Sequence, residues 1–218
     1  MSDNPRRDSL VRYSAELRTN HWLNAIAFVL AALSGLALFH PALFWFSNLF
    51  GGGPWTRTLH PFIGLAAALI FLMLAVALWD DNRMKPADWQ WLKQWRDVVD
   101  GREDRLPEVG RYNGGQKLLF LVLVVGMAGL FLSGFVIWRA YFSHYFSVRV
   151  VRLASLTHAL CAFAVIVAIL IHIYAAFWVK GSVDAIVRGT VTPGWAWKHH
   201  RAWFRQVTHA ANPRTGPN

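Results

Sequence analysis

The sequence predicts an all-α integral membrane protein: a four-helix bundle with both termini in the cytoplasm and an interfacial amphipathic helix between its second and third helices. Of the 218 residues, 55% are hydrophobic, and they gather into four long blocks. Each block approaches or exceeds the ~20 residues that a helix needs to cross a bilayer. Backbone groups in lipid must bond within the chain, and these runs are too long for barrel strands, so helices are expected.

The chain is expected to form one membrane domain, 1–218, with spans at 21–39, 55–79, 117–138 and 150–179. The first span is expected to remain in the mature protein. Its polar leader is long, and Phe39-His40-Pro41 is unlike the small-residue cleavage site of a secretory signal.

Lysine and arginine are distributed unequally over the segments that join the spans. The net charge is +10, and 18 of the 22 basic residues lie in the N-terminal arm, in 80–117 and in the tail 180–218. The opposite side has only Arg57, Arg139, Arg149 and Arg152. By the positive-inside rule this asymmetry places both termini and the basic tail in the cytoplasm. The charge therefore reflects topology, and no nucleic-acid binding is predicted.

The connecting segments carry local signals of their own. The aromatic loop 41–54 ends in a run of three glycines before Pro54, which predicts a turn. The segment 89–95 is rich in tryptophan, with Trp91 and Trp95 about one turn apart. An interfacial amphipathic helix and a Trp-rich interfacial loop both fit so short a segment. The end of the tail is expected to be disordered.

Four histidines near the ends of the spans are the candidate functional residues. His158 and His172 share the fourth span and are 14 residues apart, which is a rise of roughly 21 Å along one face of a helix. Topology places His60 at the outer depth of His158, and His21 at the inner depth of His172. Ionisable groups inside a bilayer need a reason to be there, so two imidazole pairs at two depths predict two haems.

Two axial imidazoles on each haem iron would leave no open coordination position, which suits electron transfer rather than oxygen chemistry. The single cysteine, Cys161, excludes an internal disulfide, c-type haem attachment and an iron–sulfur cluster, and it is expected to be a small packing residue. Packing or proton-relay histidines are the alternative. A proton transporter usually also has intramembrane carboxylates, and none lies within the four spans. A structural anchor needs no histidine pairs.

The first and third spans also share a short motif near their outer ends, Leu33-Ser34-Gly35 and Leu132-Ser133-Gly134. Small residues there allow a neighbouring helix or a flat ring to approach closely, and a duplicated helical hairpin is one interpretation. The other histidines are expected in outer aromatic loops or, in the tail, on a solvated face or against lipid headgroups: His40 and His144, then His199, His200 and His209.

Several motifs with defined spacing resemble those of a known family over about residues 15–206. They are His21-Trp22, Leu59-His60-Pro61-Phe62, Val109-Gly110-Arg111-Tyr112-Asn113, Gly115-Gln116-Lys117, Ile137-Trp138-Arg139, Val150-Val151-Arg152, Ile171-His172-Ile173-Tyr174, Phe177-Trp178-Val179-Lys180-Gly181 and Trp197-Lys198-His199-His200. The chain resembles the cytochrome b (gamma) subunit of respiratory formate dehydrogenase.

The resemblance implies two haem b groups, an outer one held by His60 and His158 and an inner one held by His21 and His172. It also implies a menaquinone site at the cytoplasmic side, matching Asn113, Gly115, Gln116 and His172. Amide side chains and a free backbone N–H at a helix start are donors that suit quinone carbonyls, although Asn113 also fits a helix cap.

The implied partners are an iron–sulfur beta subunit and a molybdenum or tungsten formate dehydrogenase alpha subunit. The resemblance also implies that this chain lies in the bacterial inner membrane, and a higher oligomer of the heterotrimer is a further expectation. Electrons would pass inward to quinone with proton uptake from the cytoplasm. Arg139, Arg149 and Arg152 are expected to contact haem propionates, acidic partner residues or headgroups. The cytochrome b subunits of nickel–iron hydrogenase and thiosulfate reductase are the nearest alternatives.

Overall fold

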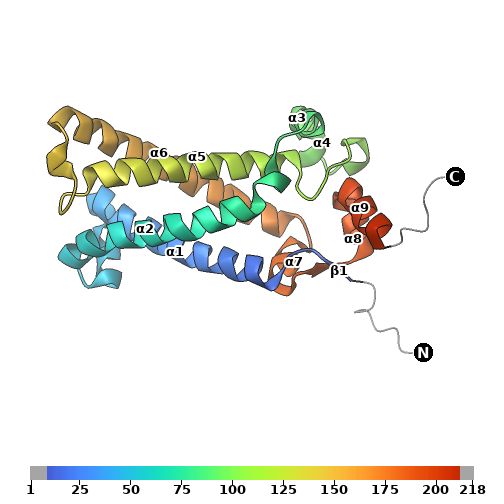
Figure 1. Cartoon of the computed structure of the whole chain (residues 1–218), viewed down its shortest axis with the longest axis horizontal. Coiled ribbons are helices and arrows are strands. Elements are labelled where there is room, and N and C mark those ends of the chain that lie inside the picture. The colour runs from blue at the N-terminus through green and yellow to red at the C-terminus, as the bar shows by residue number, and fades with distance from the viewer. Residues whose placement is uncertain (1–8, 212–218) are drawn as a thin grey trace. The chain divides into compact units, whose positions relative to one another are not determined.

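The computed structural model describes residues 9–211 as helices joined by short connections and two very short strands (Figure 1). The expected cytoplasmic location of the two termini concerns residues 1–8 and 212–218, which lie outside the described residues. In chain order the elements are β1 (Leu10–Val11), α1 (Ala15–Phe39), η1 (Pro41–Phe50), α2 (Gly53–Leu78), η2 (Asp80–Asn82), α3 (Pro86–Lys93), α4 (Trp95–Val99), η3 (Glu103–Arg105), α5 (Gly114–Ile137), η4 (Ser143–Tyr145), α6 (Val148–Trp178), α7 (Ser182–Arg188), β2 (Thr190–Val191), α8 (Pro193–His199) and α9 (Arg201–Ala211).

Among the described residues, four helices are long and apolar enough to cross a membrane: α1, α2, α5 and α6. They confirm the predicted all-α membrane bundle, and each ends within one residue of its predicted end. Each also begins earlier than predicted, by six residues in α1 and by two or three in the others. The first turn of such a helix is helical without being apolar, so hydropathy alone places the start too late.

The chain divides into two compact units. The bundle unit comprises 19–77 and 121–174, and the terminal unit comprises 1–18, 78–120 and 175–218. That the whole chain behaves as one membrane domain stays a prediction.

Close contact between α5 and α6 in the bundle unit depends on two glycines of α5. A Cβ atom at Gly129 would lie 2.6 Å from Sγ of Cys161, and one at Gly126 would overlap Cγ2 of Val165. Small residues spaced along one face of a membrane helix often let its backbone lie close to that of a neighbouring helix, as here between α5 and α6. Cys161 therefore packs against α5, in agreement with its expected role as a small packing residue.

The connection between α1 and α2 is more regular than the loop expected at 41–54. It contains the 3₁₀ helix η1, which begins where Nδ1 of His40 accepts a hydrogen bond from the backbone N–H of Ala42 at 3.2 Å. The helix ends at Gly51 and Gly52, whose φ angles of 83° and 94° are favourable for glycine. The predicted glycine turn is confirmed.

The terminal unit has a small core of its own. Ala185, Val191, Ala196 and Trp203 are buried together. The N-terminal arm joins this core as β1, whose Leu10 pairs antiparallel with Val191 of β2. Residues 180–211 are therefore a folded segment of three helices and a strand. That this basic tail is cytoplasmic stays a prediction.

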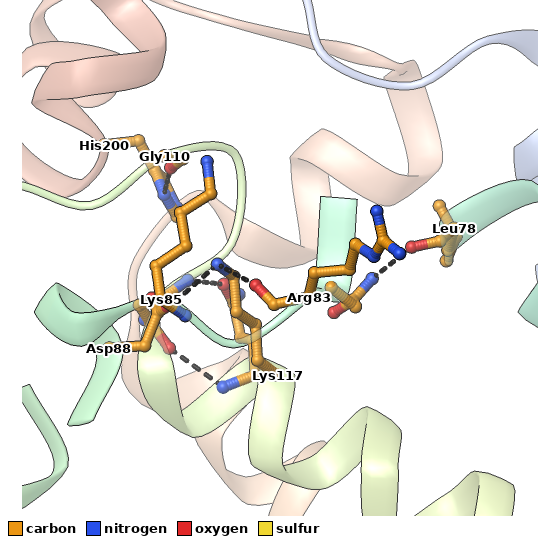
Figure 2. A network of polar contacts seen from close by, with 10 residues as sticks. Leu78, Arg83, Lys85, Asp88, Gly110, Lys117 and His200 are labelled. Carbon is orange, nitrogen blue, oxygen red and sulfur yellow. Dashed lines mark hydrogen bonds and ion pairs between the residues drawn. The ribbon is translucent and has the colours of Figure 1, made fainter. Parts of the chain in front are cut away.

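Arg12 is buried in this unit with 1% of its surface exposed, and its guanidinium group lies near four aromatic rings. Its guanidinium carbon is 4.5 Å from the ring centre of Trp203, and its Nη2 lies 3.3 Å from Nε2 of His200. An arginine can only donate, so Nε2 accepts, and Nδ1 of His200 donates to the carbonyl of Gly110 at 2.9 Å (Figure 2). Burial, and after it the charge of Arg12, lower the pKa of His200 to about 3.

His200 is thus a buried, neutral histidine, and its expected place on a solvated face or at lipid headgroups was wrong. Its residue type and its neighbours in sequence give no sign of this environment. The ring is held by Arg12, 188 positions earlier in the chain, and by Gly110, 90 positions earlier.

The tryptophan-rich segment is helical but not continuous. The helix α3 ends at Lys93, and α4 begins at Trp95 after a break at Gln94. Trp91 and Trp95 are therefore not on one face of a single helix, as the sequence had suggested. The ring of Trp91 lies against Gly114 and Gly115 at the start of α5, whereas Trp95 is exposed. A location of α3 and α4 at the membrane interface stays a prediction.

A buried ion pair connects α3 to the first turn of α5 (Figure 2). Nζ of Lys117 lies 2.7 Å from Oδ2 of Asp88, and the two side chains are 4% and 3% exposed. Lys117 also donates to the carbonyl of Arg83 at 3.1 Å, and Asp88 accepts from the backbone N–H of Lys85 at 2.8 Å. Both charges therefore have further hydrogen bonds, which a buried pair needs.

Candidate functional site

The four candidate histidines form two facing pairs in the bundle unit. The ring centres of His21 and His172 are 6.3 Å apart, and those of His60 and His158 are 6.2 Å apart. Because α6 is continuous from Val148 to Trp178, it supplies one ring to each pair. The second ring comes from α1 in one pair and from α2 in the other.

These separations suit two imidazoles on opposite sides of one metal ion. An imidazole nitrogen binds a metal at about 2.0 Å, so two rings bound on opposite sides have centres about 6 Å apart. A bare metal ion held by protein usually takes three or more protein ligands, whereas a haem supplies four nitrogens and needs only two further ligands. The residues present therefore fit a haem in each pair. That His21, His60, His158 and His172 are haem ligands stays a prediction.

A serine hydroxyl lies beside each ring of the outer pair. Oγ of Ser34 is 2.9 Å from Nδ1 of His60, and Oγ of Ser133 is 3.0 Å from Nδ1 of His158. Sequence reasoning did not predict this contact. The signal was present in the repeated Leu-Ser-Gly motif, which was interpreted only as a site of close approach.

The residues implied at the quinone site form the N-terminal cap of α5. Oδ1 of Asn113 accepts from the backbone N–H of Gln116 at 2.9 Å, and Oε1 of Gln116 accepts from the backbone N–H of Asn113 at 3.0 Å. This reciprocal arrangement is a capping box, so the cap interpretation of Asn113 holds. Capping uses the oxygens of both amides and leaves their NH2 groups as donors. Gly115 lies in the first turn, where backbone N–H groups have no partner within the helix.

The other candidate residues have more ordinary surroundings. Arg139, Arg149 and Arg152 are exposed in the bundle unit, and their expected roles toward propionates, partners or headgroups stay predictions. His144 is exposed in η4, with its ring 3.9 Å from that of Tyr145.

Comparison with known proteins gives a family and close relatives. A family model described as prokaryotic cytochrome b561 matches residues 12–189. The formate dehydrogenase cytochrome b556(fdo) subunit of Escherichia coli strain K12 is 43% identical over 202 residues, covering 93% of this chain and 95% of that protein. The formate dehydrogenase cytochrome b556 subunit of Haemophilus influenzae is 41% identical, covering 90% of this chain and 83% of that protein. The nitrate-inducible formate dehydrogenase cytochrome b556(Fdn) subunit of Escherichia coli K12 is 40% identical, with coverages of 88% and 89%.

Proposed function

Because this chain belongs to the prokaryotic cytochrome b561 family, we propose that it is the dihaem membrane subunit of a formate dehydrogenase and carries electrons through the bacterial inner membrane to a quinone. The observation that carries the proposal is that imidazole rings lie close together in two pairs, each with one ring from α6. Because α6 supplies one ring to each pair, the two pairs would provide two redox sites at different depths along that helix. The names of the relatives supply the formate dehydrogenase part.

The outer haem b would be held by His60 and His158, and the inner one by His21 and His172. When bound, the haems supply reversible one-electron chemistry. The chain would supply two neutral imidazoles to each haem, one from each histidine of a pair. Two imidazoles on each iron would leave no coordination position open to water or oxygen.

Electrons would enter from an iron–sulfur subunit that is served by a molybdenum or tungsten catalytic subunit outside the membrane. The asymmetry of lysine and arginine supports this direction, because it puts the His60–His158 pair on the outer side. Electron movement inward combined with proton uptake from the cytoplasm would build a membrane potential. The exposed outer arginines, Arg139, Arg149 and Arg152, are suited to acidic residues of such a partner.

The quinone site would be formed by the first turn of α5, with His172 as the further residue that the family resemblance implies. A quinone carbonyl needs hydrogen-bond donors, and the amide NH2 groups of Asn113 and Gln116 are of this kind. The positive end of the helix dipole would favour the negative charge that develops as the quinone is reduced. Gly115 would contribute its backbone N–H, and the ring of Trp91 occupies the space that a side chain at this position would need.

The direct test is a haem-to-protein ratio combined with formate-dependent reduction. We expect the purified complex to contain two haem b per copy of this chain, and formate alone to reduce both. A reduced-minus-oxidised spectrum and a pyridine haemochrome assay measure these quantities. A ratio of one, or haems that hydrogen but not formate reduces, would contradict the proposal.

Gln116→Glu should impair quinone binding specifically. Glutamate keeps an oxygen that can accept from the N–H of Asn113, but it lacks the NH2 donor. The loss of one hydrogen bond is worth about 0.5–1.5 kcal/mol, so the apparent KM for quinone should rise roughly 2- to 10-fold. Steady-state kinetics with a soluble quinone analogue measure this effect.

The matched control is Gln90→Glu, an exposed position on α3. Haem spectra and formate-dependent haem reduction should stay unchanged in both variants. Equal quinone kinetics in Gln116→Glu and Gln90→Glu would remove Gln116 from the proposed quinone site.

A further inference from the structure

The repeated Leu-Ser-Gly motif is in contact with one histidine pair. Ser34 on α1 meets His60, 26 positions later on α2, and Ser133 on α5 meets His158, 25 positions later on α6. Ser34 is 0% exposed and Ser133 is 5% exposed, so water does not compete for either contact. Two separate helix pairs therefore present the same hydroxyl to the same nitrogen, Nδ1.

The direction of each hydrogen bond follows from the single hydrogen of a hydroxyl group. Oγ of Ser34 lies 2.8 Å from the carbonyl of Leu30, and Oγ of Ser133 lies 2.5 Å from the carbonyl of Gly129. Carbonyls only accept, so each serine gives its hydrogen to its own helix. The serine oxygen then accepts from Nδ1–H of the histidine. This tautomer leaves the lone pair on Nε2, the nitrogen that is free to bind iron.

The glycine of each motif brings the helix backbone against the ring edge. A Cβ atom at Gly35 would lie 3.1 Å from Cε1 of His60, and one at Gly134 would lie 3.3 Å from Cε1 of His158. Both distances are tighter than ordinary van der Waals contact, so a side chain would push the ring away. Each serine–glycine pair thus defines both the hydrogen bond and the position of its imidazole.

His21 of the inner pair is held differently. Nδ1 of His21 is buried and has no hydrogen-bond partner within the part of the chain that the structure describes. Its ring instead makes an edge contact with Trp22, with centres 5.3 Å apart. The hydroxyl acceptors at His60 and His158 are therefore a property that distinguishes the outer pair from His21.

We infer that Ser34 and Ser133 are positioning residues that strengthen the two outer histidines as iron ligands and lower the reduction potential of the outer haem. The inference rests on the proposed haem ligation by His60 and His158. An acceptor at Nδ1–H fixes the tautomer and raises the basicity of Nε2, and a more basic axial ligand stabilises the ferric state. A lower outer potential favours onward electron transfer to the inner haem.

The test is a potentiometric titration of both haems in the membrane-bound complex carrying Ser34→Ala, Ser133→Ala or both. Each single substitution should shift the ferric–ferrous equilibrium of the outer haem about threefold toward the ferrous state, or ~28 mV at 59 mV per tenfold change for one electron. The inner potential and the haem content should not change. The low-spin electron paramagnetic resonance signal of the outer haem should shift with the potential.

Two controls separate hydrogen bonding from packing. Ser155 on α6 also donates to a carbonyl four residues earlier, that of Val151 at 2.9 Å, but it is exposed, so Ser155→Ala should leave both potentials unchanged. Ser34→Thr and Ser133→Thr keep the hydroxyl and should stay close to the wild-type potential. If an alanine variant loses haem, the threonine variant should retain it.

Each negative result has a distinct meaning. Unchanged potentials in the double alanine variant with full haem content would overturn the inference while leaving the ligand assignment intact. Haem loss in both the alanine and the threonine variants would overturn it as well, because the serine would then act only through packing. Two haems retained in His60→Ala would instead contradict the ligand assignment in the proposed function.

Discussion

His158→Ala is expected to lower the haem content from two per chain to one and to stop formate from reducing the haem that remains. His158 and His60 are the only imidazoles that face each other at the outer level among the described residues. Removal of one axial ligand leaves a single imidazole, which holds a haem poorly in an apolar bundle. The remaining pair, His21 with His172, would then be separated from electrons that arrive at the outer side in the proposed path.

The matched variant His172→Ala tests the order of the two sites. It should also leave one haem per chain, but formate should still reduce that haem while quinone reduction stops. His144→Ala, an exposed histidine in η4, is the control and should leave haem content and reduction unchanged. Haemochrome assays, together with spectra recorded after addition of formate, measure all three variants. Full haem content in His158→Ala, or formate reduction that is lost only in His172→Ala, would contradict the proposed path.

Asp88→Asn is expected to destabilise the start of α5 by about 3–5 kcal/mol, because it leaves the ammonium of Lys117 buried without its counter-charge. The substitution preserves shape and removes the negative charge. Hydrogen exchange at amides of α3 and of the first turn of α5 should accelerate by roughly 100-fold or more. The thermal midpoint of the complex in detergent should fall.

Removing the lysine charge as well should relieve most of the effect. Asp88→Asn with Lys117→Met takes away both charges, and buried pairs replaced by apolar groups are often close to neutral. Asp184→Asn is the control, because its pair with Arg188 has 69% and 75% of the two side chains exposed and is worth about 0.5 kcal/mol or less. Similar effects for Asp88→Asn and Asp184→Asn would show that the buried pair contributes little to stability.

The predictable part of the fold rests on local properties. Length and hydropathy identify α1, α2, α5 and α6, because a bilayer selects each helix segment by segment. The order of the spans, together with the charge asymmetry, assigns each histidine a depth. The rings of His60 and His158, and those of His21 and His172, lie together in the structure in the pairs that this depth order specifies.

The terminal unit shows where local reasoning fails. The strand β1 pairs with β2 across about 180 residues of chain, and Arg12 and His200 are buried through that association. Neither segment has a long apolar run, and an arginine-rich arm and a basic tail look solvated when each is considered by itself. The break at Gln94 was likewise not predicted, and Trp91 on α3 lies against the glycines of α5.

The sequence by itself determined the four membrane-length helices and their approximate ends, and it predicted the depths of the four histidines, because hydropathy, charge bias and helical rise are properties of single segments. Only the tertiary structure decided that Ser34 and Ser133 accept from the outer histidines, that β1 pairs with β2, and that Arg12 and His200 are buried together. These are contacts between groups far apart in the chain or dependent on side-chain direction, and their energies exist only once the helices have packed.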